Sequence, residues 1–114
     1  MKKIILTAML ILVAMPFSAV ATTNQELLSN CEKEDIPKGV CFGYIQGVTE
    51  FMQRQKATEK KFPDVCLPEN VTVGQLVKVY QKWTEERPEI LHKHAIKGVI
   101  LSLEDAFPCD PKAK

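Results

Sequence analysis

The sequence predicts an all-α protein, a small bundle of about four helices held by two disulfides. Three observations lead to this fold class. Apolar residues recur at spacings of three and four along most of the chain, which is the period of an amphipathic helix. No stretch alternates between apolar and polar residues for long enough to predict a strand. The chain has four cysteines, enough for two disulfides in a domain with one small core.

Residues 1–21 are predicted to be a signal peptide that is removed on export. Lys2 and Lys3 give a positive start, residues 4–17 are uncharged and almost all apolar, and Ala19-Val20-Ala21 is the small-x-small pattern that signal peptidase reads. The apolar run is shorter than the roughly 20 residues that span a bilayer, which disfavours a retained anchor. We therefore expect one mature domain, residues 22–114, in the periplasm and without membrane contact.

The charge of the mature domain argues against one class of partner. The full chain has 15 basic and 14 acidic residues, and the leader contains two of the lysines, so 13 basic residues remain for a formal charge of −1. Proteins that bind nucleic acid need clustered lysines and arginines to displace phosphate counterions. No nucleic-acid partner is predicted.

The first helix is expected over residues 23–31, with Asn24 as its N-cap. Residues 32–39, which contain charges, a proline and a glycine, are expected to form a loop. The apolar residues of the first helix that recur at helical spacing are Leu27, Leu28 and Cys31.

The second helix is expected over residues 40–55. Its core-facing stripe consists of Phe42, Ile45, Val48, Phe51 and Met52. Gly43 and Gly47 stand four apart, and each costs about 1 kcal/mol of helix stability relative to alanine. We expect the close approach of another helix as the compensation.

The third and fourth helices are separated at Arg87-Pro88. Thr72 and Gln75 form a capping-box pattern that starts the third helix. Proline fits the first turn of a new helix, so the fourth is expected over residues 88–106. Among the aromatic residues, Tyr44, Tyr80 and Trp83 suit either a core or an interface.

The short connection between the last two helices predicts an antiparallel hairpin, which brings Cys66 near Cys109. The same reasoning places Cys31, at the end of the first helix, near Cys41 at the start of the second. Of three possible connectivities, Cys31–Cys41 with Cys66–Cys109 is therefore favoured. No metal is predicted, because no C-x2-C pair exists and the paired histidines of the fourth helix would point to different faces.

The residues offer no clear catalytic site, and the chain is predicted not to be an enzyme and to bind no cofactor. Cysteines paired in disulfides cannot act as thiolate nucleophiles. His92 and His94 are expected on the surface. The carboxylates Glu85, Glu86 and Glu89 resemble the acid pairs of glycosidases, but they suit the dipole of a helix start. A basic run, Lys56, Lys60 and Lys61, is expected to be a solvated loop, without aromatic residues for nucleotide stacking.

Several ordered motifs resemble one family. They are Cys41-Phe42-Gly43-Tyr44-Ile45-Gln46-Gly47-Val48, Cys66-Leu67-Pro68, Val71-Thr72-Val73-Gly74-Gln75-Leu76-Val77, Arg87-Pro88-Glu89 with Leu91-His92 and Ala95, and Ala106-Phe107-Pro108-Cys109. Together they are similar to the Rap/Tai family, periplasmic immunity proteins of type VI secretion systems. The likeness covers about residues 31–109.

The resemblance implies a small helical protein, often a homodimer, that protects a bacterium from a secreted peptidoglycan amidase by obstructing its active-site groove. The family's motif residues are mainly framework, so the contact surface is a separate question. The candidates are the junction Thr84, Glu85, Glu86 and Arg87, up to Pro88, and the loop Arg54–Phe62. The alternative function is a small periplasmic binding protein, such as an acid-stress chaperone.

Overall fold

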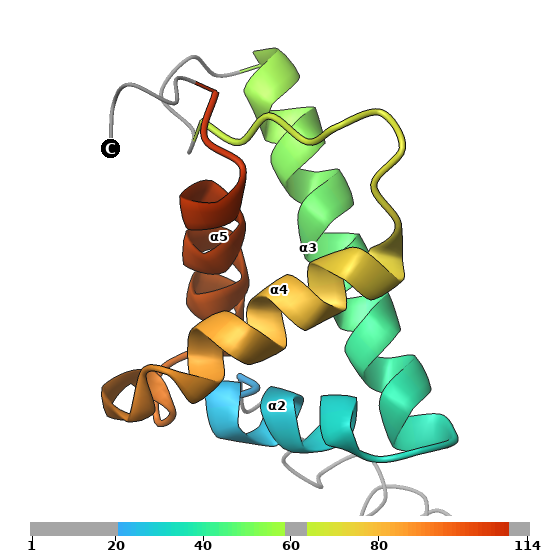
Figure 1. The fold of residues 1–114 in the computed structure, drawn as a ribbon, viewed down its shortest axis with the longest axis vertical. Helices are drawn as coiled ribbons and strands as arrows, with labels where there is room; N and C mark the ends of the chain where they lie inside the picture. Colours follow the sequence, from blue (N-terminus) through green and yellow to red (C-terminus); the bar gives the residue numbers. More distant parts are fainter. Residues whose placement is uncertain (1–20, 59–63, 110–114) are drawn as a thin grey trace, which may run out of the picture.

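The computed structural model describes residues 21–58 and 64–109, and it confirms the all-α class (Figure 1). These residues form four α-helices and one short 3-10 helix, and no strand is found among them. The predicted signal peptide lies almost wholly outside the described residues and stays a prediction. The elements are α2 (Asn24–Glu32), α3 (Ile36–Thr58), α4 (Val73–Glu85), η1 (Pro88–Ile90) and α5 (Ala95–Ala106).

Each of the four α-helices contacts the other three. In Figure 1, α3 is the long element, α4 crosses it, α2 lies across one end of the bundle, and α5 stands beside the other helices. The core forms where these elements meet. Its side chains without any exposed area come from all four helices: Leu27, Cys41, Ile45, Tyr80, Ala95, Val99 and Leu103.

The predicted stripe of α3 is confirmed in its middle and wrong at one position. Ile45, Val48 and Met52 are buried, and Phe42 packs against the core from a half-buried position. Phe51, by contrast, is 45% exposed. A helix of 23 residues that is crossed by α4 presents only part of its apolar surface to the core.

The first helix is confirmed, but its N-cap is Thr23, one residue before the predicted cap Asn24. The Thr23 hydroxyl accepts a hydrogen bond from the Glu26 N–H at 3.3 Å, and the Glu26 carboxylate accepts one from the Thr23 N–H at 3.0 Å. This is a complete capping box. Asn24, predicted as the cap, is instead buried, with 1% of its surface exposed.

The connection between α2 and α3 is shorter than the predicted loop over residues 32–39. Helix α3 already begins at Ile36, with Pro37 in its first turn, where a proline costs no hydrogen bond. Asp35, just before the helix, has φ of 60°, in the left-handed region that aspartate tolerates better than most residues. This conformation turns the chain within three residues.

The third helix starts as predicted, and the fourth does not. The Thr72 and Gln75 capping box is present, with distances of 2.8 and 3.2 Å. After Pro88 the chain makes only one 3-10 turn, and α5 begins at Ala95 instead of residue 88. The backbone between η1 and α5 does not continue the helix, because the carbonyl groups of Leu91 and Lys93 accept hydrogen bonds from N–H groups at the start of α2.

The glycine that permits a close approach is Gly98, not Gly43 or Gly47. A Cβ atom at either of the latter would meet nothing within 4 Å, so no helix of this fold packs closely there and that prediction is wrong. A Cβ atom at Gly98 would overlap the Asn24 amide, lying 2.8 Å from its Cγ. The buried asparagine and the glycine therefore fit together across α2 and α5.

Both predicted disulfides are present. Cys31–Cys41 joins the end of α2 to the first turns of α3. Cys66–Cys109 joins the segment before α4 to the segment after α5, where the Cys66 N–H also donates to the Phe107 carbonyl at 2.9 Å. Within residues 21–58 and 64–109, no helix has the length and apolar content needed to cross a membrane.

Candidate partner interface

The predicted contact junction lies where α4 ends and turns toward α5. Glu86 follows the last residue of α4, and its N–H donates to the Lys82 carbonyl at 3.3 Å. The Arg87 N–H donates to the Thr84 carbonyl at 3.0 Å, which closes the helix end. Pro88 then starts η1. The junction is thus built from satisfied backbone groups and a proline.

Arg87 is held against Trp83. Its guanidinium carbon lies 4.3 Å from the centre of the Trp83 ring, which is cation–π geometry. The Arg87 Nη1 donates to the Trp83 carbonyl at 2.9 Å and lies 3.8 Å from the Glu86 carboxylate. These contacts fix a long side chain in one orientation, and they form a small surface of aromatic and charged groups.

The four predicted contact residues do not all face the same way. Glu85 and Glu86 are exposed, and Arg87 is half-buried. Thr84 has no exposed surface, and its side chain belongs to the core. Thr84 is therefore not available to a partner in this fold, and the junction presents Glu85, Glu86 and Arg87.

A hollow adjoins this junction, and its far wall was not predicted from the sequence. One side is formed by α4 and the junction, the other by the last turns of α5. The lining residues are Val79, Lys82, Trp83, Glu86, Arg87, Ser102, Asp105 and Ala106. Once α4 and α5 are taken as a hairpin, the helical spacing of the α5 residues could have indicated that they face Trp83.

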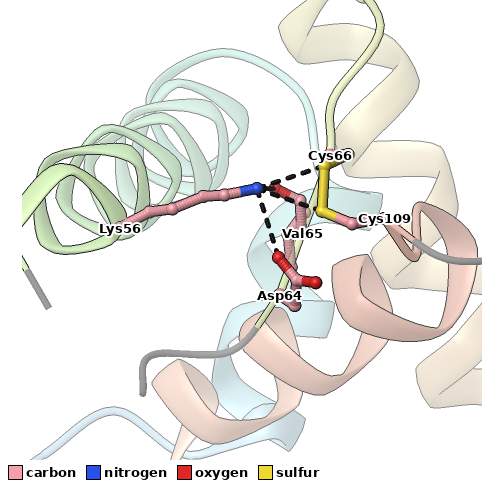
Figure 2. Close-up of polar contacts among 5 residues, drawn as sticks. All are labelled: Lys56, Asp64, Val65, Cys66 and Cys109. Carbon is pink, nitrogen blue, oxygen red and sulfur yellow. Dashed lines mark hydrogen bonds and ion pairs between the residues drawn. A yellow bond between two sulfur atoms is a disulfide. The ribbon is translucent and has the colours of Figure 1, made fainter. Parts of the chain in front are cut away.

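The second predicted contact region, Arg54–Phe62, is described only as far as Thr58, where α3 ends. Residues 59–62 lie outside the described part. The side chain of Lys56, predicted as a solvated lysine, is anchored (Figure 2). Its Nζ lies 3.3 Å from Asp64 Oδ1, 3.2 Å from the Val65 carbonyl, 3.1 Å from Cys66 Sγ and 3.0 Å from Cys109 Sγ.

This cluster places three potential metal-ligand atoms, from Asp64, Cys66 and Cys109, within 4.8 Å of one another. The two sulfurs are joined to each other, however, and a metal binds cysteine as the thiolate. The position of the Lys56 ammonium beside both sulfurs further disfavours a second cation.

The ionisable residues considered for catalysis lie on the surface. His92, His94, Glu85, Glu86 and Glu89 are all exposed.

The fold and the junction define a class: a small, disulfide-bonded helical protein. Its junction carries tryptophan and arginine, residues that are enriched where proteins bind one another. The model of the Rap1a immunity proteins matches residues 23–109, and the chain belongs to this family. The match begins at the α2 N-cap and ends at the last cysteine, so it spans the framework. Searches of curated proteins and of solved structures find no match. Membership gives the chain an immunity role, the binding of a secreted type VI effector protein.

Proposed function

We propose that this chain is a periplasmic immunity protein that binds a peptidoglycan amidase delivered by type VI secretion and blocks its active-site groove. The observation that carries the proposal is the family match over residues 23–109. The predicted leader, residues 1–21, supports the location, since an inhibitor of a cell-wall enzyme must be exported. The amidase would be a cysteine hydrolase that cuts the peptide stem of the cell wall.

The junction Glu85, Glu86 and Arg87 is the proposed contact with the effector. Arg87 is already ordered by Trp83, so binding would cost little side-chain entropy. Tryptophan and arginine are the residue types most often found to dominate binding energy. The two glutamates beside them would select a partner surface that carries positive charge.

The function is tested with the amidase of a type VI competitor, expressed with an export signal in cells that carry or lack this protein. Cells that carry it should survive, and the purified protein should inhibit stem-peptide cleavage of isolated peptidoglycan. Lysis in both strains, together with no complex in size-exclusion chromatography, would reject the proposal for that amidase. A panel of amidases from sibling strains extends the test to the specificity.

The contact surface is tested with Arg87→Ala and with a Glu85→Lys, Glu86→Lys double variant. We expect each to weaken amidase binding by about 30-fold, the effect of losing a typical interface hot spot. Glu69→Lys is the matched control, because Glu69 is an exposed glutamate in the segment before α4, at the opposite end of that helix from the junction. An equal loss of binding in the control would show that the net charge of the protein, and not the junction, determines the affinity. Unchanged binding in all variants would show that the amidase binds another surface.

We also propose that the protein forms a homodimer through the outer face of α3. Three large apolar side chains are exposed along this helix: Ile36 by 81%, Val40 by 51% and Phe51 by 45%. Gly43 and Gly47 lie between them on the same face, with open space above both. Small residues flanked by apolar ones permit two helices to approach closely.

An antiparallel pair of α3 helices suits the charges of this face. Asp35 lies at its start and Arg54 near its end, so the antiparallel arrangement places these two opposite charges near each other. The helix is about 35 Å long at 1.5 Å per residue, which is long enough for a contact of several turns.

The dimer is tested by measuring the mass of Gly47→Leu in solution. A leucine fits the single subunit, because nothing lies near the position, but it would separate two paired helices. We expect a monomer for this variant and a dimer for the unchanged protein and for Lys78→Leu, an exposed control on α4. A dimer that persists in Gly47→Leu would exclude this face.

A further inference from the structure

The disulfide Cys66–Cys109 has a cation beside it. The Lys56 ammonium reaches from the last turn of α3 to within 3.0 Å of Cys109 Sγ and 3.1 Å of Cys66 Sγ (Figure 2). A disulfide sulfur is only a weak acceptor, so these contacts contribute little to stability. A thiolate at the same position would be a far better partner for the ammonium.

The two disulfides differ in their access to solvent. Cys31 is 6% exposed and Cys41 not at all, so a reagent reaches this disulfide only after α2 and α3 separate. Cys66 is exposed and Cys109 half-buried. Lys56 itself is 42% exposed, which leaves room for an attacking group beside the ammonium.

We propose that Cys66–Cys109 is a site of thiol–disulfide exchange for dithiol reductants of the Cys-x-x-Cys class, with Lys56 as the residue that activates it. The reductant's thiolate attacks the exposed Cys66 sulfur. A reductant–Cys66 bond forms, the Cys66–Cys109 bond breaks, and Cys109 leaves as a thiolate that the Lys56 ammonium stabilises. The second thiol of the reductant, deprotonated by solvent, then attacks the mixed disulfide and releases the Cys66 thiolate. The reductant leaves as a disulfide, so two electrons pass to the protein.

Asp64 moderates this site. Its carboxylate lies 3.3 Å from Lys56 Nζ, so it orients the ammonium but also offsets part of its charge. Removal of the ammonium should slow the exchange, and removal of the carboxylate should accelerate it. Substitutions of Lys56 and Asp64 are thus expected to change the rate of exchange in opposite directions.

The effect of exchange is confined to one end of the fold. The Cys66 N–H donates to the Phe107 carbonyl, and Val65 pairs with Pro108 in an isolated β-bridge. The disulfide therefore joins two segments that already pair through their backbones, the one before α4 and the one after α5. Reduction leaves this contact to its few hydrogen bonds, while Cys31–Cys41 continues to hold α2 to α3. The partly reduced protein therefore keeps one complete disulfide.

The test is timed reduction of the oxidised, folded protein with dithiothreitol, followed by alkylation with iodoacetamide and mass mapping of the modified cysteines. We expect Cys66 and Cys109 to be alkylated at least tenfold faster than Cys31 and Cys41, because only the former disulfide is accessible. Simultaneous modification of all four cysteines would mean that reduction requires global unfolding, and it would overturn the proposal.

The role of Lys56 is tested with Lys56→Met, which keeps the side-chain length and removes the charge. We expect this variant to react about threefold more slowly, the effect of a one-unit change in thiol acidity on exchange. Asp64→Asn should react faster, and Lys97→Met, an exposed lysine on α5, should be unchanged. Destabilised variants are reduced faster, not slower, so a slower Lys56→Met cannot arise from poor folding. An unchanged or faster rate would remove Lys56 from the site.

Discussion

The Tyr80 hydroxyl donates a hydrogen bond to Asn24 Oδ1 at 3.0 Å, and neither residue reaches the surface, with exposed fractions of 0% and 1%. The Asn24 amide also donates to the carbonyl groups of Ile90 at 2.9 Å and Lys93 at 3.2 Å. One buried side chain thereby connects α2, α4 and the turn before α5. Buried polar groups that are fully paired in this way fix a single arrangement of the elements around them.

Replacement of Asn24 by alanine should reduce the free energy of unfolding by about 3 kcal/mol or more. The change removes three hydrogen bonds of a buried side chain, each worth about 0.5 to 1.5 kcal/mol, and leaves a cavity in place of the amide. The carbonyl groups of Ile90 and Lys93 each keep one backbone N–H donor. Urea unfolding followed by circular dichroism measures the effect. Gln25→Ala, at the exposed neighbouring position, should change it by less than about 0.5 kcal/mol.

Stability should fall as the pH rises above 10, because of Tyr80. Burial raises the pKa of Tyr80 from 10.0 to about 12, partly opposed by the neighbouring Thr84 side chain and reinforced by Tyr44. Between these values the unfolded chain loses the phenol proton and the folded one keeps it, so the contribution is complete below pH 10 and lost by about pH 12. The loss is roughly 2 to 3 kcal/mol.

The control for this pH dependence is Tyr80→Phe, which has no phenol to titrate. Its stability should be lower at neutral pH, because Asn24 loses a partner, but should decline less steeply above pH 10. A smaller decline should remain, since burial also raises the pKa of Tyr44. Parallel curves for the two proteins would contradict the assignment to Tyr80.

Alanine should have opposite effects at the glycines of α3 and α5. Gly98→Ala should destabilise the fold by at least about 2 kcal/mol, since the new methyl group overlaps the buried Asn24 amide. Gly43→Ala should stabilise the single subunit by up to about 1 kcal/mol, because the position is open and helical. Thermal unfolding of both variants distinguishes them, and a stabilised Gly98→Ala would contradict the close packing described.

Removal of each disulfide by paired serine substitutions should cost different amounts. The chain-entropy relation gives about 3 kcal/mol for Cys31–Cys41, with a sequence separation of 10, and about 4 kcal/mol for Cys66–Cys109, with a separation of 43. Cys31 and Cys41 are buried, so serine there adds the cost of burying hydroxyl groups. The measurement is urea unfolding of the two double variants, in which the midpoint and the slope of the free energy of unfolding against urea are both compared with those of the unchanged protein.

The features predicted correctly follow from local sequence patterns or from the order of helices and turns. The Thr72–Gln75 capping box lies within four residues, and both disulfides follow from the order of helices and turns. The sequence favours Asn24 as a cap because its residue type suits that position, whereas its partners in the fold are 56 to 69 residues away. No local pattern reveals such a contact.

The same limit explains the errors at α5 and on the surface. The late start of α5 depends on carbonyl groups that α2 occupies, and the open space above Gly43 depends on which way α3 turns. At the candidate interface, the proline marks the turn after α4, while the contact of this turn with a partner stays a prediction. The inward orientation of Thr84 and the α5 wall of the hollow required the packed structure.

The pairing of the α2 start with the turn before α5 has a consequence for maturation. The Thr22 carbonyl accepts a hydrogen bond from the Ala95 N–H at 2.8 Å, and Thr23 forms a β-bridge with His94. Cleavage after Ala21, as we expect, would leave no spacer between the new amino terminus and the folded domain. Trimming by an aminopeptidase past Thr23 would remove the N-cap of α2. A purification tag is better placed at the carboxyl end, where it does not disturb the pairing of Thr22 and Thr23 with His94 and Ala95.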